Sequence, residues 1–204
     1  MTTIVLARGN LASDRMCVEY TNHFMHLRKK SAVGTNGTVG IAIGGKARTN
    51  EILVKLADMC EALDWIDIHI EENEEKYKYL RDDALALSKS LAELLDEDSL
   101  FVVYRSRGKV KMCYAEGHVG NSGDLDLKSL FDDSYQTYGT GAAMAEFEIR
   151  HQYSKGIEDY AVLFEVVSSI EECTSKEHDV IYGEDLKDIA EVKEVDIKIK
   201  ELLK

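Results

Sequence analysis

The sequence contains no proline, no Cys-x-x-Cys motif and no apolar run long enough to cross a bilayer. Its glycines fall in separate turns, so nothing predicts a linker, and we expect one domain over residues 1–204. The first residues lack the basic and apolar segments of a signal peptide. The cysteines lie far apart, which favours reduced, buried thiols over disulfides: Cys17, Cys60, Cys113 and Cys173. Together these absences predict a cytoplasmic protein.

Positive charge is also scarce. The chain carries 25 Lys and Arg against 38 Asp and Glu, a formal net charge of −13, which disfavours nucleic acid and anionic membrane surfaces as partners. Histidines do not show metal-ligand spacing either: only His23 and His26 lie close together, in a predicted loop. We therefore expect no zinc site, no other metal and no cofactor.

The apolar periodicity predicts strands, helices, strands and helices in that order. Expected strands cover residues 2–6, 11–14, 39–43, 100–104, 109–114 and 179–182. Expected helices cover the apolar stripes from Ile52 to Leu63 (capped by Thr49 or Asn50), from Tyr77 to Leu95, from within residues 138–145, from Ile157 to Glu172, and from Leu186 to Ile199. This order suggests two stacked sheets with helices outside each, an α+β or layered α/β fold.

Thr2 lies at the tip of the first predicted strand, Thr2-Thr3-Ile4-Val5-Leu6. If Met1 is removed, Thr2 carries a nucleophile, its hydroxyl, and a base, its own α-amine. The α-amine titrates at about 8, so an appreciable part of it is neutral at pH 7. An ordinary first strand explains the same residues, because many proteins begin Met-Thr.

The order and spacing of several motifs resemble the proteasome-type N-terminal-nucleophile hydrolases, which include proteasome β-subunits and bacterial peptidase subunits that pair with an unfoldase. The motifs are Thr2-Thr3-Ile4-Val5, Gly9-Asn10-Leu11-Ala12-Ser13-Asp14, Lys30 six residues before Asn36-Gly37, Gly44-Gly45, Gly139-Thr140-Gly141 and Glu172-Cys173-Thr174-Ser175. The similarity spans roughly residues 2–183. It implies a four-layer αββα sandwich of two stacked, mainly antiparallel sheets, with residues 184–204 as a C-terminal helical extension.

The resemblance also implies roles for individual residues. Thr2 would be nucleophile and base, and Lys30 would lower the pKa of its hydroxyl. Asp14 would pair with Lys30, and an N–H of Gly44 or Gly45 would stabilise the oxyanion. Two bland alternatives stay open at this point: Lys30 could belong to a surface basic cluster, and Asp14 could be a plain turn residue.

Five further residues complete the implied site. Thr140 and Ser175 would support the amine with their hydroxyls, and Glu172 would anchor that network. Ala42 and Ile43 would line the substrate pocket and favour an apolar residue before the cut. Glu172 and Thr140 depart from the family pattern, which has Asp and Ser at these two positions.

Two functions from different classes follow. The first is a threonine peptidase that assembles into ring-forming homo-oligomers and cleaves peptides or unfolded proteins, with an ATP-dependent unfoldase as a possible separate partner. The second is a catalytically silent structural or binding protein that keeps Met1 and uses only the assembly surface. Hydrolysis of small amides on the same fold is a third, weaker alternative.

Overall fold

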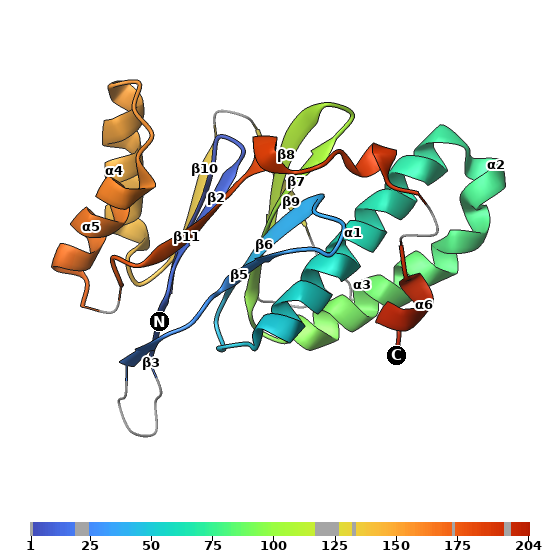
Figure 1. Cartoon of the computed structure of the whole chain (residues 1–204), viewed down its shortest axis with the longest axis horizontal. Coiled ribbons are helices and arrows are strands. Elements are labelled where there is room, and N and C mark those ends of the chain that lie inside the picture. The colour runs from blue at the N-terminus through green and yellow to red at the C-terminus, as the bar shows by residue number, and fades with distance from the viewer. Residues whose placement is uncertain (1, 19–24, 117–126, 132–133, 173, 194–196) are drawn as a thin grey trace.

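The computed structural model describes residues 2–18, 25–116, 127–131, 134–172, 174–193 and 197–204 (Figure 1). Met1, Cys173 and His23, on which some of the expectations depend, lie outside these residues. Cys17, Cys60 and Cys113 are free and buried, as expected. Among the described residues, no helix has the length and apolar character needed to cross a membrane.

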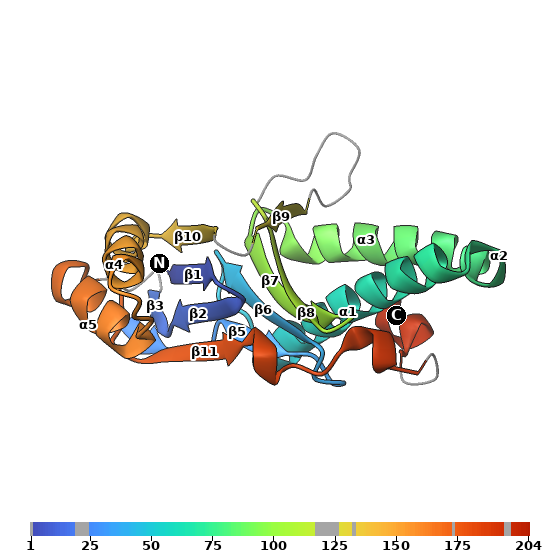
Figure 2. The ribbon, with the colours of Figure 1, turned by 90° about the horizontal axis from the view of Figure 1, so that it is seen from above.

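Two antiparallel sheets lie face to face between two helical layers (Figures 1 and 2). The first sheet has the strand order β10 (Tyr135–Gly139), β1 (Thr3–Ala7), β2 (Asn10–Asp14) and β11 (His178–Tyr182). The second has the order β5 (Ser31–Val33), β6 (Val39–Gly44), β7 (Ser99–Ser106), β8 (Lys109–Ala115) and β9 (Lys128–Leu130). Helices α4 (Ala142–Ser154) and α5 (Tyr160–Ile170) cover the first sheet, and α1 (Asn50–Glu72), α2 (Glu74–Tyr77) and α3 (Arg81–Leu95) lie on the side of the second. The expected four-layer αββα sandwich is confirmed.

Strand β1 is buried on both faces because it is central in its sheet and covered on each side. Its side chains alternate: Ile4 and Leu6 join the apolar cluster between the two sheets, whereas Val5 and Ala7 face α4 and α5. A third and larger cluster fills the space between the second sheet and the helices α1 and α3. The first residues of the chain are therefore fixed by packing on both sides.

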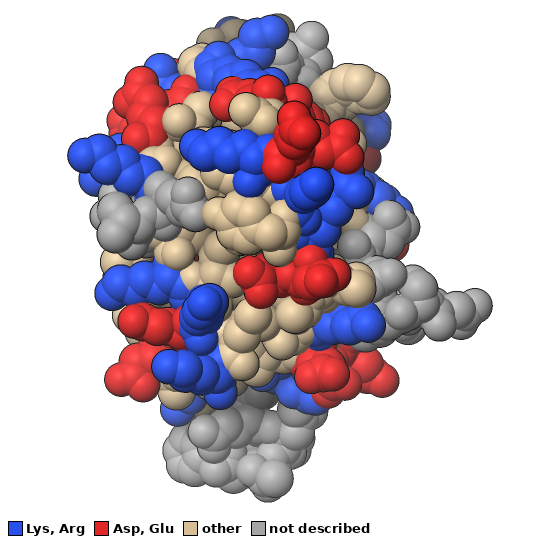
Figure 3. All heavy atoms as spheres, turned by 90° about the vertical axis from the view of Figure 1, so that its right-hand side faces the viewer, with Lys and Arg blue, Asp and Glu red and all other residues tan. Residues whose placement is uncertain are grey.

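The N-terminus of α1 forms as expected, since the Thr49 hydroxyl accepts a hydrogen bond from the Ile52 N–H at 3.4 Å. The helix runs further than its first apolar stripe and ends at Glu72, and Asn73 caps α2. Charges of both signs alternate on the side of the molecule that carries α2 and α6 (Ile199–Leu202), with neither sign dominating (Figure 3).

Two expectations about irregular segments need correction. The segment 21–30, expected to be irregular, contains β4 (Met25–Leu27), which pairs with β3 (Met16–Val18) as a separate two-stranded ribbon. The second correction concerns the C-terminal segment, which is not one helix.

In the described residues 183–193 and 197–202, the helical structure consists only of short turns: η2 (Gly183–Asp185), η3 (Ile189–Glu191) and α6. The apolar residues there serve different cores, because Leu186 packs between the sheets and Ile189 packs against α1. Asp188, between them, accepts hydrogen bonds from the N–H groups of Arg107 and Gly108. A single straight helix could not make these three contacts. The segment from Gly183 to Glu191 therefore runs across both sheets as an extended strap.

Candidate active site

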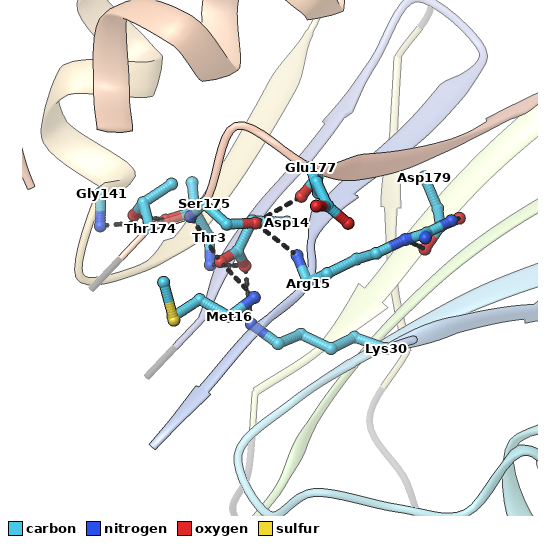
Figure 4. Close-up of polar contacts among 10 residues, drawn as sticks. All are labelled: Thr3, Asp14, Arg15, Met16, Lys30, Gly141, Thr174, Ser175, Glu177 and Asp179. Carbon is cyan, nitrogen blue, oxygen red and sulfur yellow. Dashed lines mark hydrogen bonds and ion pairs between the residues drawn. The ribbon is translucent and has the colours of Figure 1, made fainter. Parts of the chain in front are cut away.

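Asp14, the last residue of β2, is the centre of a buried polar network at the N-terminal end of β1 (Figure 4). Its Oδ1 accepts hydrogen bonds from the Thr3 N–H at 2.8 Å and from Lys30 Nζ at 2.7 Å. Its Oδ2 accepts from the N–H groups of Met16 at 3.0 Å and Ser175 at 3.3 Å. The Asp14 side chain has no exposed surface, and these four donors replace the water that it loses.

Lys30 forms the charged partner of Asp14. Its side chain is 6% exposed, whereas the neighbouring Arg28 and Lys29 are exposed to solvent. The surface basic cluster therefore accounts for Arg28 and Lys29 but not for Lys30. Burying such a pair costs desolvation energy that an apolar pair would avoid, so its presence suggests a role other than stability.

The peptide bond that follows Thr2 is held at both of its polar atoms. The Thr2 carbonyl accepts a hydrogen bond from the Thr140 N–H at 3.0 Å, and the Thr3 N–H donates to Asp14. Gly139 has φ +93°, and any Cβ there would collide with the Thr2 carbonyl oxygen. Thr2 itself is 3% exposed. The position of Thr2 is therefore set by β10 on one side and by the Asp14–Lys30 pair on the other.

The Gly44-Gly45 turn lies beside the same network, because the Ile43 N–H donates to the Lys30 carbonyl at 2.9 Å. A Cβ on Gly44 would collide with the Tyr138 ring, and Gly45, at φ +142°, has no space for one beside the Asp98 carboxylate. The Asp98 carboxylate also accepts a hydrogen bond from the Lys46 N–H at 2.8 Å, which fixes the residue that follows the turn. The backbone of Gly44 and Gly45 is therefore held rigidly and carries no side chain that could block an approaching group. A peptide N–H in such a turn can act as a preorganised donor.

Solved structures of Anbu and of HslV share this architecture. The helical assembly of the Anbu complex from Pseudomonas aeruginosa is similar with a TM-score of 0.56 and 13% identity, over 100% of this chain and 91% of that chain. The Gly-1 mutant of Anbu from Hyphomicrobium sp. strain MC1 is similar with a TM-score of 0.54 and 12% identity, over 100% and 92% of the two chains. Eukaryotic HslV from Trypanosoma brucei is similar with a TM-score of 0.50 and 16% identity, over 88% and 98%. No protein-family model and no curated protein matches the sequence.

The chain has the fold of the proteasome-type N-terminal-nucleophile hydrolases. At identities of 11–16% the likeness establishes this fold and no more, so any activity has to be argued from the residues around Thr2. In this N-terminal-nucleophile hydrolase fold, Thr2 precedes the central strand of one sheet, and Lys30 precedes the first strand of the other.

A groove of about 520 Å³ runs along β10, and one of its lining residues, Gly139, lies against the Thr2 carbonyl. It includes Gly139, which pairs with Thr3, and Ser99, which pairs with Gly44. The groove therefore adjoins both the strand of the candidate nucleophile and the candidate oxyanion turn. Its remaining lining residues are Glu97, Glu116, Gln136, Thr137, Tyr138 and Ala142.

The two residues expected to line a substrate pocket lie inside the fold. Ala42 is fully buried in the cluster between the sheets, and Ile43 is 3% exposed in the cluster against α1. Neither belongs to the groove beside Thr2. Both are core residues in this chain, and their contact with a substrate remains a prediction.

The supporting residues are only partly where the sequence suggests. Thr140 contributes its backbone N–H to the Thr2 carbonyl, and its side chain is exposed. The Ser175 hydroxyl donates to the Glu177 carbonyl at 2.5 Å and accepts the Arg15 N–H at 3.3 Å, so its partners are backbone groups. Glu172 is exposed, and the described part of the chain shows no hydrogen bond from it to Thr2 or Asp14. The expected roles of these side chains remain predictions.

Thr3 and Thr174, which the sequence analysis does not assign to the site, bind each other at the start of β1. The hydroxyls of Thr3 and Thr174 share a hydrogen bond of 2.7 Å, and the Gly141 N–H donates to Thr3 Oγ1 at 3.2 Å (Figure 4). Thr3 follows Thr2, and Thr174 precedes Ser175; in both cases the motif pattern favours the other hydroxyl residue of the pair. The sequence signal for both was a pair of adjacent hydroxyl residues, which does not say which of the two faces the site.

Proposed function

We propose that the protein is a proteasome-like threonine peptidase subunit, in which Thr2 acts as the N-terminal nucleophile once Met1 has been removed. The observation that carries this proposal is the carboxylate of Asp14, which binds both Lys30 Nζ and the N–H of the peptide bond that follows Thr2. Because one carboxylate oxygen binds both groups, this contact supports a role for the buried charge of Lys30 in lowering the pKa of the Thr2 hydroxyl.

The proposed reaction needs only groups of this chain and water. The Thr2 hydroxyl oxygen attacks the carbonyl carbon of the scissile peptide bond, while the hydroxyl proton moves to the free α-amine of Thr2. The carbon–nitrogen bond then breaks as the leaving amine takes that proton. The ester left on Thr2 is hydrolysed by water, with the same amine as the base.

Two parts of the site would lower the barrier. An N–H of Gly44 or Gly45 would donate to the oxyanion of the tetrahedral intermediate, a contribution of about 10²–10³ in rate for a single donor. The charge of Lys30 would favour the developing alkoxide of Thr2, and Asp14 would keep that charge oriented. The groove along β10 supplies a surface beside Thr2 on which an extended chain could lie.

The subunit is further proposed to act inside a self-compartmentalised homo-oligomer in the cytoplasm. Anbu from Pseudomonas aeruginosa forms a helical assembly, and it shares this fold. The outer helices α4 and α5 expose large apolar side chains, which is typical of surfaces that associate: Phe147, Val162 and Ile170. A chamber of this kind would admit peptides or unfolded chains, with a separate ATP-dependent unfoldase as a possible partner.

The intact mass of the purified protein and its hydrolysis of fluorogenic peptides test the proposal. We expect a mass without Met1 and measurable hydrolysis, which Thr2→Ser retains and Thr2→Val abolishes while the thermal unfolding temperature stays unchanged. A native assembly that keeps Met1 and hydrolyses nothing would contradict the peptidase and favour the catalytically silent structural protein. Hydrolysis that survives in Thr2→Val would place the nucleophile elsewhere.

A further inference from the structure

The first residue of β1 is held by more contacts than a strand end needs. The Thr3 N–H is bound by Asp14, and its hydroxyl is bound by the Gly141 N–H and by the Thr174 hydroxyl. Thr3 has no exposed surface and Thr174 is 3% exposed, so water does not compete for these bonds. Thr3 is thereby fixed through both its backbone and its side chain.

These contacts come from two turns that are remote from β1 in sequence. Gly141 belongs to the turn between β10 and α4, and Thr174 belongs to the turn between α5 and β11. A Cβ on Gly141 would collide with Thr3 Oγ1 and would also come within 2.9 Å of Thr174 Oγ1. Glycine is therefore required for the three groups to meet, which marks the contact as a built feature of the fold.

Thr2 has no comparable side-chain support among the described residues, so its orientation depends on the residue that follows it. Because Thr2 and Thr3 share a peptide plane, a rotation of Thr3 would turn the α-carbon of Thr2, and with it the hydroxyl and the amine. A displacement of about 1 Å at a nucleophile can cost up to about 10²-fold in rate.

We propose that Thr174 is a positioning residue for the Thr2 nucleophile and acts through the hydroxyl of Thr3. The proposal rests on the proposed function, since it concerns the reactivity of Thr2. It assigns to Thr174 the anchoring that the motif pattern gives to Glu172 and Ser175, whose side chains point to solvent and to the Glu177 carbonyl.

The experiment measures the second-order rate at which an electrophilic peptide labels the protein, together with kcat and KM for a fluorogenic peptide. Thr174→Val keeps the shape of the side chain and removes its hydroxyl, whereas Thr174→Ser keeps the hydroxyl. We expect Thr174→Val to lower the labelling rate and kcat about tenfold with KM nearly unchanged, and Thr174→Ser to restore most of both. A purely structural residue would not show this split or this rescue.

Thr38→Val is the matched control. Thr38 is equally buried and its hydroxyl donates to the Glu61 carboxylate, but it lies at the other end of β6 from Gly44. We expect this variant to lose stability and to be labelled at the wild-type rate. The double variant Thr3→Val/Thr174→Val should be no slower than Thr3→Val alone, because both substitutions remove the same bond.

Each outcome decides one of the two proposals. A folded Thr174→Val protein that is labelled as fast as the wild type would overturn the positioning role and leave the peptidase standing. The same holds if Thr174→Ser is as slow as Thr174→Val. Wild-type protein without Met1 that is not labelled at Thr2 would overturn the proposed function, and the positioning role with it.

Discussion

Two regions of the molecule contain ion pairs with similar distances and very different surroundings. At the start of β1, Lys30 and Asp14 lie 2.7 Å apart with 6% and 0% of their side chains exposed. Near α2, Arg81 and Glu74 lie 2.5 Å apart with 58% and 66% of their side chains exposed. Distance therefore does not distinguish the two pairs. Burial does, since only the pair beside Thr2 is removed from water.

The same contrast extends to the hydroxyl and carboxylate groups around each pair. At the start of β1, three of the donors to Asp14 come from remote segments of the chain: Thr3 in β1, Lys30 just before β5 and Ser175 in the turn before β11. In the exposed pairs Arg81–Glu74 and Lys198–Glu201, by contrast, the partners lie seven and three residues apart. A network that brings remote segments together at one carboxylate specifies a site, whereas local exposed pairs mainly provide solubility.

The largest expected effect is on stability. Asp14→Asn leaves Lys30 buried without a counter-charge, so the free energy of unfolding should fall by about 3–5 kcal/mol. The matched exposed change, Glu74→Gln, should cost less than about 0.5 kcal/mol. Urea unfolding of both variants measures the difference. Equal losses in the two variants would show that burial does not separate the regions.

The second prediction concerns reactivity rather than stability. Lys30→Met keeps the length of the side chain but removes its charge, and should slow labelling of Thr2 by an electrophilic peptide about 10²-fold. Lys198→Met, which breaks the exposed pair with Glu201 on α6, should leave the labelling rate unchanged. If Lys30→Met were labelled at the wild-type rate, the buried pair would be structural only.

Besides Asp14 and Glu74, a third carboxylate, Asp64, tests the effect of burial on stability away from the candidate site. Asp64 on α1 faces the second sheet, and burial raises its pKa to about 8, with the charges of Asp67 and Glu61 acting in the same direction and Lys111 against it. The folded protein keeps a proton that the unfolded chain loses above about pH 4, so stability should fall as pH rises from about 4 to 8.

Asp64→Asn removes that dependence. After allowance for partial exposure, wild-type protein should lose about 2 kcal/mol of unfolding free energy between pH 5 and pH 8 that the variant keeps. Glu93→Gln, an exposed carboxylate on α3, should retain the wild-type pH dependence. Urea unfolding at the two pH values measures the difference. An equal change in unfolding free energy for Asp64→Asn and wild type would show that Asp64 does not cause the pH dependence.

The smallest expected effect lies at the end of the sandwich remote from Thr2. Asp188→Ala removes the side chain that accepts the N–H groups of Arg107 and Gly108, which should cost about 1 kcal/mol. Labelling of Thr2 should not change, because the hairpin turn does not contact the network of Asp14. A slower labelling rate in a fully folded Asp188→Ala protein would mean that the two ends are coupled.

Much of the fold could be predicted from local patterns. The strand β1, the hairpin of β7 and β8 and the cap of α1 at Thr49 each depend on residues that are close together in sequence, so periodicity and capping rules find them. The strap after Tyr182 could not be predicted this way. Leu186 and Ile189 fit a helical stripe, yet they enter different cores because the shape of the two sheets decides where they pack.

The candidate site divides in the same manner. Asp14 and Lys30 were found through the spacing of motifs that resemble a known family, and the structure confirms their pairing. Thr174 was missed in favour of Ser175, since the direction of a side chain in a turn depends on backbone angles that the sequence does not state. Local chemistry predicts which residue types gather at a site, but turn geometry decides which of two neighbours faces it.

The most direct test of Thr2 as the nucleophile is to map the covalent adduct formed with an electrophilic peptide by proteolytic digestion and tandem mass spectrometry. We expect one adduct per subunit, on an N-terminal peptide that begins at Thr2. An adduct on any other residue, or an unmodified N-terminal peptide that still carries Met1, would contradict the assignment of Thr2 as the nucleophile.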